Sequence, residues 1–128
     1  MNLDADVRRL IKGTNYAHIA TVLPDGAPHA VPMWVDMEGE HIAVLTDPRS
    51  VKARNLERDP RVALSIIDQE SPNVMAHIRG RLIATVDGDA GWAIIDRLAH
   101  KYVGTDYPLR TDRVALLIEP HRAWAQSF

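Results

Sequence analysis

Residues 16–36 read YAHIATVLPDGAPHAVPMWVD, and this stretch decides the fold. Both of its halves are rich in β-forming side chains, so they predict two strands. The Asp25-Gly26 dipeptide between them predicts a tight turn because it readily supplies positive φ. Pro28 and Pro32 cannot donate a backbone hydrogen bond, so we expect the second strand to lie at a sheet edge or to be bulged. The stretch therefore predicts an antiparallel hairpin.

The rest of the chain predicts four further strands and three helices. Strands are expected at residues 16–23, 27–36, 41–46, 61–68, 74–86 and 113–119, with residues 121–126 extending the sheet beyond Pro120. Helices are expected at the N-terminus with a stop at Gly13, over residues 47–58, and from residue 87 to a stop at Gly104. Gly80 predicts a bulge in the long fifth strand. Consecutive strands with hairpin-like turns favour a mainly β fold, an antiparallel barrel or sheet with peripheral helices.

The composition is that of a soluble globular protein, and we expect residues 1–128 to form one domain. Apolar residues make up 46% of the chain and charged residues 25%, which is usual for this class. There is no cysteine, which excludes disulfides, thiolate nucleophiles and zinc–thiolate sites. No apolar run approaches the roughly 20 residues of a membrane-spanning helix and no secretion signal is visible, so we expect a cytoplasmic protein without a membrane partner. The net charge of −2 gives no reason to expect nucleic-acid binding.

The most informative segment chemically is residues 46–60, TDPRSVKARNLERDP. Asp47 is the expected N-cap of its helix, and Pro48 suits the first helical position. Two hydroxyls, from Thr46 and Ser50, come beside the start of this helix. A helix N-terminus offers unpaired N–H groups and a partial positive charge to an anion, and hydroxyls can complete the hydrogen bonds of a tetrahedral ligand. The segment is therefore a candidate phosphate site.

Three side chains of this segment recur at about one-turn spacing, namely Arg49, Lys52 and Asn55, so we expect them to project from one face. The lysine would add a point charge to the anion site. The alternative interpretation is an ordinary solvated helix, in which Glu57 and neighbouring aspartates pair with the basic residues. The pattern by itself leaves both interpretations open.

The order of motifs from residue 16 to residue 124 resembles the pyridoxamine-phosphate-oxidase-like (flavin reductase-like) split-barrel superfamily. Five segments carry the resemblance: ATVLPDGAPH at 20–29, VPMWV at 31–35, the T-x5-K-x2-N-L-x3-P pattern at 46–60, NVMAHIRG at 73–80 and IDRLAHKYVGTDYP at 95–108. The last segment is similar to a helix and loop typical of the branch that depends on the deazaflavin coenzyme F420. The resemblance implies a split β-barrel fold and a homodimer with two equivalent sites between the subunits.

The resemblance also implies the roles of individual residues. Eight positions are the expected cofactor-binding set: Thr46, Ser50, Lys52 and Asn55 at the phosphate region, Pro32, Met33 and Trp34 along the ring, and His77 in a strand leading to the ring pocket. The second subunit would close the pocket, with Trp92, Lys101 and Tyr102 as further candidates. FMN-binding relatives commonly carry additional arginine or lysine contacts to the phosphate, whereas position 51 is valine here, which favours the deazaflavin over FMN.

The function that the resemblance implies is that of a coenzyme F420-dependent oxidoreductase, which transfers a hydride between the deazaflavin and a small organic substrate. Two alternatives stay open: an FMN-binding oxidase or reductase of the same fold, and a non-catalytic protein that carries or binds F420. The sequence identifies no general acid among its residues. The cofactor supplies the reactive ring in such enzymes, while the protein fixes geometry and excludes water.

The histidines and tryptophans need a separate interpretation. No two of the six histidines lie four residues apart, and none has an acidic neighbour in a known ligand pattern, so no metal is assigned; they are His18, His29, His41, His77, His100 and His121. Taken alone, His77 is better interpreted as a hydrogen-bonded strand histidine than as a residue facing the pocket. Trp34 could stack on a planar ring or fill the core, whereas packing is the better interpretation of Trp92 and Trp124.

Overall fold

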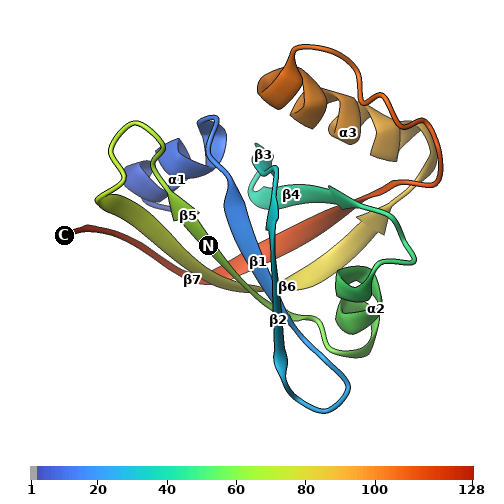
Figure 1. Ribbon diagram of the computed structural model, residues 1–128, viewed down its shortest axis with the longest axis horizontal. Coiled ribbons are helices and arrows are strands. Elements are labelled where there is room, and N and C mark those ends of the chain that lie inside the picture. The colour runs from blue at the N-terminus through green and yellow to red at the C-terminus, as the bar shows by residue number, and fades with distance from the viewer. Residues whose placement is uncertain (1–2) are drawn as a thin grey trace.

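The computed structural model describes residues 3–128, and in this range seven strands and three helices follow one another (Figure 1). In chain order they are α1 (Ala5–Lys12), β1 (Ala17–Val22), β2 (Pro28–Met33), β3 (Asp36–Glu38), β4 (His41–Thr46), α2 (Val51–Arg58), β5 (Arg61–Ile67), β6 (Val74–Val86), α3 (Gly88–Val103) and β7 (Val114–Ser127). The predicted mainly β class with peripheral helices is confirmed. None of the described helices is both long enough and apolar enough to cross a membrane.

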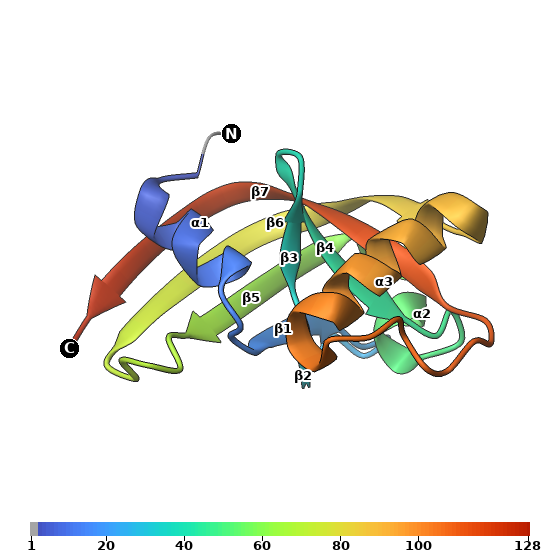
Figure 2. The same cartoon turned by 90° about the horizontal axis from the view of Figure 1, so that it is seen from above.

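All seven strands belong to one antiparallel sheet in the order β2-β1-β5-β6-β7-β4-β3. Strands β5, β6 and β7 run side by side along the molecule (Figure 2). Within the described residues, strand β2 pairs only with β1, and Pro32 lies opposite His18, so the predicted edge position is confirmed. A proline has no backbone N–H to donate, so a strand that contains prolines cannot form a full set of hydrogen bonds with a neighbour on each side.

The expected second strand is shorter than predicted, and a seventh strand was not predicted. Strand β2 ends at Met33 instead of continuing to Asp36, which instead begins β3. The connecting residue Val35 donates its N–H to the Tyr102 hydroxyl at 3.1 Å, and its carbonyl accepts from Lys101 Nζ. These side chains replace the ladder partners that a longer strand would need.

The long strands β6 and β7 are kinked where Gly80 faces Pro120. The register shifts between Arg79 and Gly80, where the glycine predicted a bulge, but the extra residue is His121 of the partner strand β7. A Cβ at Gly80 would lie 2.3 Å from the Glu119 carbonyl oxygen, so only glycine fits there without movement of the backbone. Strand β7 continues through Pro120 to Ser127, which confirms the predicted extension of the sheet.

Helix α2 starts later than the sequence predicts. Its N-cap is Ser50, whose Oγ accepts from the Ala53 N–H at 3.2 Å. Asp47 was the wrong choice because its carboxylate accepts from the Arg49 N–H at 2.8 Å and closes a turn before the helix. Pro48 therefore lies in that turn rather than at the first helical position. The other ends agree with prediction, since α1 stops before Gly13, and α3 ends at Gly104 with φ of +77°.

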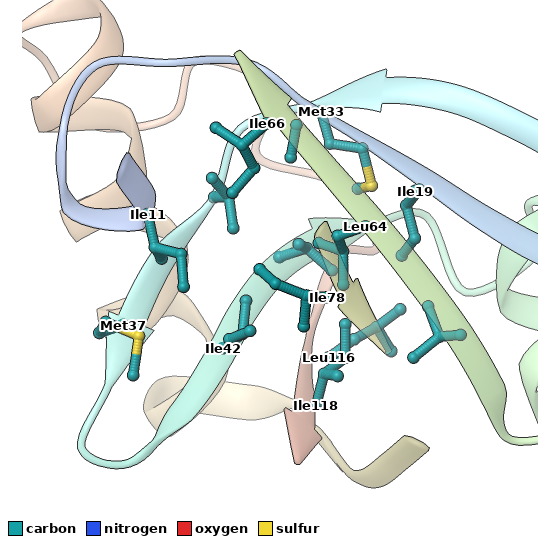
Figure 3. Close-up of a cluster of buried hydrophobic side chains, with 14 of the residues drawn as sticks. Ile11, Ile19, Met33, Met37, Ile42, Leu64, Ile66, Ile78, Leu116 and Ile118 are labelled. Atoms are coloured by element: carbon teal, nitrogen blue, oxygen red, sulfur yellow. The ribbon is translucent and has the colours of Figure 1, made fainter. Parts of the chain in front are cut away.

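Two clusters of buried hydrophobic side chains join the sheet to its helices. The larger lies between the sheet and α1, and its labelled side chains point toward one another in Figure 3; they include Ile11, Ile19, Ile42, Leu64, Ile78, Leu116 and Ile118. The smaller joins Ile95 and Leu98 of α3 to Ala43 and Ala115. Neighbouring residues of a strand face opposite sides, so Ile42 meets the larger cluster while Ala43 meets α3. Strand β4 is thus buried on both faces.

Candidate functional site

A pocket of about 710 Å³ opens between the end of β2, the start of α2 and the loop that follows α3. It is lined by Tyr16, Pro32, Met33, Trp34, Leu45, Lys52, Val103, Thr105, Tyr107, Pro108 and Leu109. The volume falls in the range of sites for small molecules and cofactors, and the lining is mostly apolar as such sites are. Among the residues that the structure describes, Lys52 is the one charged side chain in the lining. The pocket therefore suits a flat apolar group with an anionic extension.

Four of the eight predicted site residues line this pocket together: Pro32, Met33, Trp34 and Lys52. They come from the end of β2, the connection that follows it, and α2, so the sheet brings two separate motifs to one cavity. The assignment of all eight as cofactor-binding residues stays a prediction.

Trp34 forms an aromatic wall that is supported from within the same chain. The Tyr102 ring stacks on it with centroids 5.2 Å apart and planes 4° apart. The Tyr107 ring meets it edge-on at 6.0 Å. Stacked and edge-to-face pairs are the favoured arrangements of aromatic rings. One face of the indole is therefore already covered by this chain's own Tyr102, a residue expected to act in closing the pocket from a second subunit.

Lys52 is half-buried in the pocket wall, and no carboxylate of the described residues lies within ion-pair distance of its ammonium group. Burial lowers the pKa of Lys52, and the positive charge of Arg113 lowers it further, whereas Asp47 acts in the opposite direction. A desolvated ammonium without a counter-ion favours the binding of an anion. The Val51 and Lys52 N–H groups at the start of α2 also have no acceptor in the described part of the chain.

The predicted hydroxyls already serve the protein itself. Thr46 is only 3% exposed, and its Oγ1 lies 2.7 Å from Ser50 Oγ. Ser50 in turn caps the third N–H of α2, on Ala53. Part of the helix end is therefore occupied by its own cap. An anion at this end would use the two free N–H groups and Lys52, and Thr46 would act by holding Ser50.

Asn55 and His77 lie apart from the pocket lining. Asn55 is 2% exposed, and its Nδ2 donates to Thr21 Oγ1 at 3.0 Å, which ties α2 to β1. His77 stacks on Trp124 at 4.9 Å on a different hollow of the sheet. The expectation that Arg49, Lys52 and Asn55 share one helix face is wrong. Arg49 precedes the helix and pairs with Asp47, and only Lys52 faces the pocket.

Sequence reasoning missed Arg113, Tyr16 and the residues after Gly104. Arg113 reaches the start of α2 because β4 and β7 pair Thr46 with Val114, which brings its guanidinium within 3.7 Å of Asp47. A local pattern cannot reveal a neighbour that lies so far along the chain. For Tyr107 a signal existed, because it lies in the segment 95–108, but the resemblance of that segment pointed to the deazaflavin-dependent branch and not to a pocket wall. Leu109 lies just after that segment. Among the described residues no group of three possible metal ligands comes together.

The sequence matches the pyridoxamine 5'-phosphate oxidase family over residues 3–127. The chain therefore belongs to this family, and the predicted split-barrel superfamily is confirmed. The family binds flavin-type cofactors, which agrees with the coarse prediction of a flavin-type oxidoreductase. A solved structure described as an F420 reductase is 28% identical, with a TM-score of 0.83 over 96% of this chain and 98% of that chain.

Two more distant structures share the fold. One is a conserved hypothetical protein from Mycobacterium tuberculosis, 23% identical with a TM-score of 0.79 over 99% of this chain and 86% of its own. The other is General Stress Protein 26 from Bacillus anthracis, 19% identical with a TM-score of 0.74 over 98% of this chain and 94% of its own. At these identities the likeness concerns the fold alone. None of the curated proteins matches this chain in sequence.

Lys101 and Tyr102 lie behind Trp34, and the shifts of their pKa values predict how the free energy of unfolding depends on pH. Burial lowers the pKa of Lys101 from 10.5 to about 8, and burial raises the pKa of Tyr102 from 10.0 to about 12. Between pH 8 and 10 the unfolded chain binds more protons at Lys101, so the free energy of unfolding rises with pH. Above pH 10 the unfolded chain has already lost the Tyr102 proton, so the free energy of unfolding falls.

Urea unfolding at a series of pH values measures this profile. We expect a smaller rise between pH 8 and 10 in Lys101→Met, with part of it retained because Lys52 acts in the same direction. The exposed Lys12, changed to Met, is the matched control and should keep the full rise. A rise of the same size in Lys101→Met and in the unchanged protein would contradict the assignment.

Proposed function

We propose that this protein is a coenzyme F420-dependent oxidoreductase that transfers a hydride between the deazaflavin and a small organic substrate. The observation that carries the proposal is that an apolar pocket with an aromatic wall adjoins Lys52, a half-buried lysine at a helix N-terminus that forms no ion pair within residues 3–128. The likeness to an F420 reductase over nearly the full length of both chains supports the deazaflavin over FMN. The valine at position 51, which adds no positive charge, supports the same choice.

The anionic part of the cofactor is held at the start of α2. Lys52 Nζ supplies a charge there, and the N–H groups of Val51 and Lys52 supply directed donors. Thr46 keeps Ser50 in its capping position, so the helix end keeps its shape. Arg113 adds to the local positive potential, and this local charge outweighs the slightly negative net charge of the chain.

The ring part of the cofactor lies along the end of β2. Pro32, Met33 and Trp34 form this side of the pocket, and the loop carrying Tyr107 and Leu109 forms the opposite side. When bound, the reduced deazaflavin supplies the hydride. The residues of the chain exclude water from the ring and hold it at a fixed distance from the substrate.

We also propose that two copies of the chain form a homodimer, with the second copy covering the pocket rim. Three large apolar side chains at this rim are half exposed or more: Tyr16 at 50%, Val103 at 53% and Leu109 at 56%. Clustered apolar exposure of this kind is typical of an interface or ligand site. Light scattering after size exclusion should give twice the chain mass, and a monomer mass at micromolar concentration would contradict the dimer.

Titration with the two ring compounds and a turnover assay test the function. We expect F420 to bind more tightly than FMN, as measured by quenching of deazaflavin or flavin fluorescence. We expect reduced F420 to be consumed in the presence of enones or quinones. Tight FMN binding with weak F420 binding would support the FMN alternative, and F420 binding without consumption by any acceptor would support a carrier. Binding of neither compound at micromolar concentration would overturn the proposed function.

Lys52→Ala tests the anion site. We expect the substitution to weaken F420 binding by about 1–3 kcal/mol, the range for loss of a hydrogen bond to a charged group. Binding to the unchanged protein should also weaken at alkaline pH, because the pKa of Lys52 is already lowered and the neutral amine attracts no anion. Lys12→Ala makes the same change of net charge at an exposed position and should leave the affinity unchanged. Equal affinities of the two variants would count against the site.

A further inference from the structure

The wall residue Trp34 lies in a connection that has no strand partner of its own. Strand β2 ends one residue before it and β3 begins two residues after it. The backbone here must therefore find other partners, since buried N–H and C=O groups are almost always paired. Those partners are side chains from the last turn of α3.

Tyr102 supplies two kinds of contact to this connection. Its hydroxyl accepts from the Val35 N–H at 3.1 Å and donates to the Asn15 carbonyl. Its ring stacks on the Trp34 indole with planes only 4° apart. One side chain thus fixes both the backbone after Trp34 and the orientation of the indole itself.

Lys101 completes the support from the neighbouring position. Its ammonium group donates to the carbonyl of Ile11 at 3.0 Å, to that of Lys12 at 3.2 Å and to that of Val35. The Asp36 carboxylate lies 3.8 Å away. The end of α1, the connection after β2 and the end of α3 are therefore tied at one point directly behind the pocket wall.

We propose that Tyr102 is a positioning residue of the pocket, which holds the Trp34 indole as a fixed wall against which the cofactor ring binds. This inference rests on the proposed function. Tyr102 is absent from the pocket lining, so it acts through Trp34 and not by contact with the ring. A wall that is already oriented loses little freedom on binding, and this pre-organisation increases affinity.

The test is a double-mutant cycle between Tyr102 and Trp34, with the dissociation constants of F420 and FMN as the readout. In the unchanged background, we expect Tyr102→Leu to weaken ring binding by about two- to tenfold, the range that an aromatic pair contributes. In the Trp34→Ala background, the same substitution should have no further effect, because coupled residues are not additive. Tyr102→Phe keeps the stacked ring and should recover part of the lost affinity.

Ile118→Val is the control that distinguishes the positioning role of Tyr102 from a general loss of stability. Ile118 is fully buried in the larger cluster, away from the pocket, so its shortening lowers stability and should leave ring affinity unchanged. Equal weakening by Tyr102→Leu with and without Trp34 would overturn the inference. Unchanged affinity in Tyr102→Leu would overturn it as well.

A cofactor-free measurement distinguishes failure of this inference from failure of the proposed function. Changing Trp92 and Trp124 to Phe leaves Trp34 as the one tryptophan of the chain. In this background Tyr102→Leu should shift the Trp34 emission to longer wavelength and lower its anisotropy, because the indole loses its support. Unchanged emission and anisotropy overturn the positioning role. A protein that shows the spectral change but binds neither ring compound overturns the proposed function and supports the coupling of Tyr102 to Trp34.

Discussion

The close packing of α3 against β4 and β7 is the constraint on which the pocket depends. Ala43 and Ala115 are fully buried beneath Ile95 and Leu98, and their small size lets the helix approach the sheet. Because β4 has the larger core on its other face, it cannot shift away from the helix. The end of β4 leads into α2, which carries Lys52, and the end of α3 lies behind Trp34, so this one contact helps to place both pocket residues.

Much of the sheet could be predicted from the sequence because its signals are local. The Asp25-Gly26 turn and the prolines of β2 act on their own backbone and agree with the structure. Gly80 correctly marked the place of a register shift, although the extra residue lies in β7. The start of α2 was misplaced because two residues could cap it. Asp47 uses its carboxylate for Arg49, which leaves the cap to Ser50.

The candidate site was only partly predictable, because long-range contacts that leave no local pattern bring some of its residues together. Pro32, Met33, Trp34 and Lys52 stand out in recognisable motifs, and the structure brings them to one pocket. Tyr16 belongs to none of these motifs and reaches the pocket through packing. Arg113 reaches the start of α2, outside the pocket lining, through the pairing of β4 with β7. Lys101 and Tyr102 were expected to act in closing the pocket from a second subunit, yet they contact Trp34 and Val35 of their own chain. Which residues touch a cofactor remains a prediction.

The prolines of β2 limit the addition of a strand from another chain to this edge of the sheet. An exposed edge strand is a template on which another chain can add a strand, and this is a route to aggregation. Prolines occupy two of the six positions of β2, and each removes an N–H that strand addition would require. Continuous cross-chain pairing along this margin is therefore blocked. At this edge, self-association of the kind proposed uses side chains rather than an added strand, which favours a closed pair over an open-ended fibre.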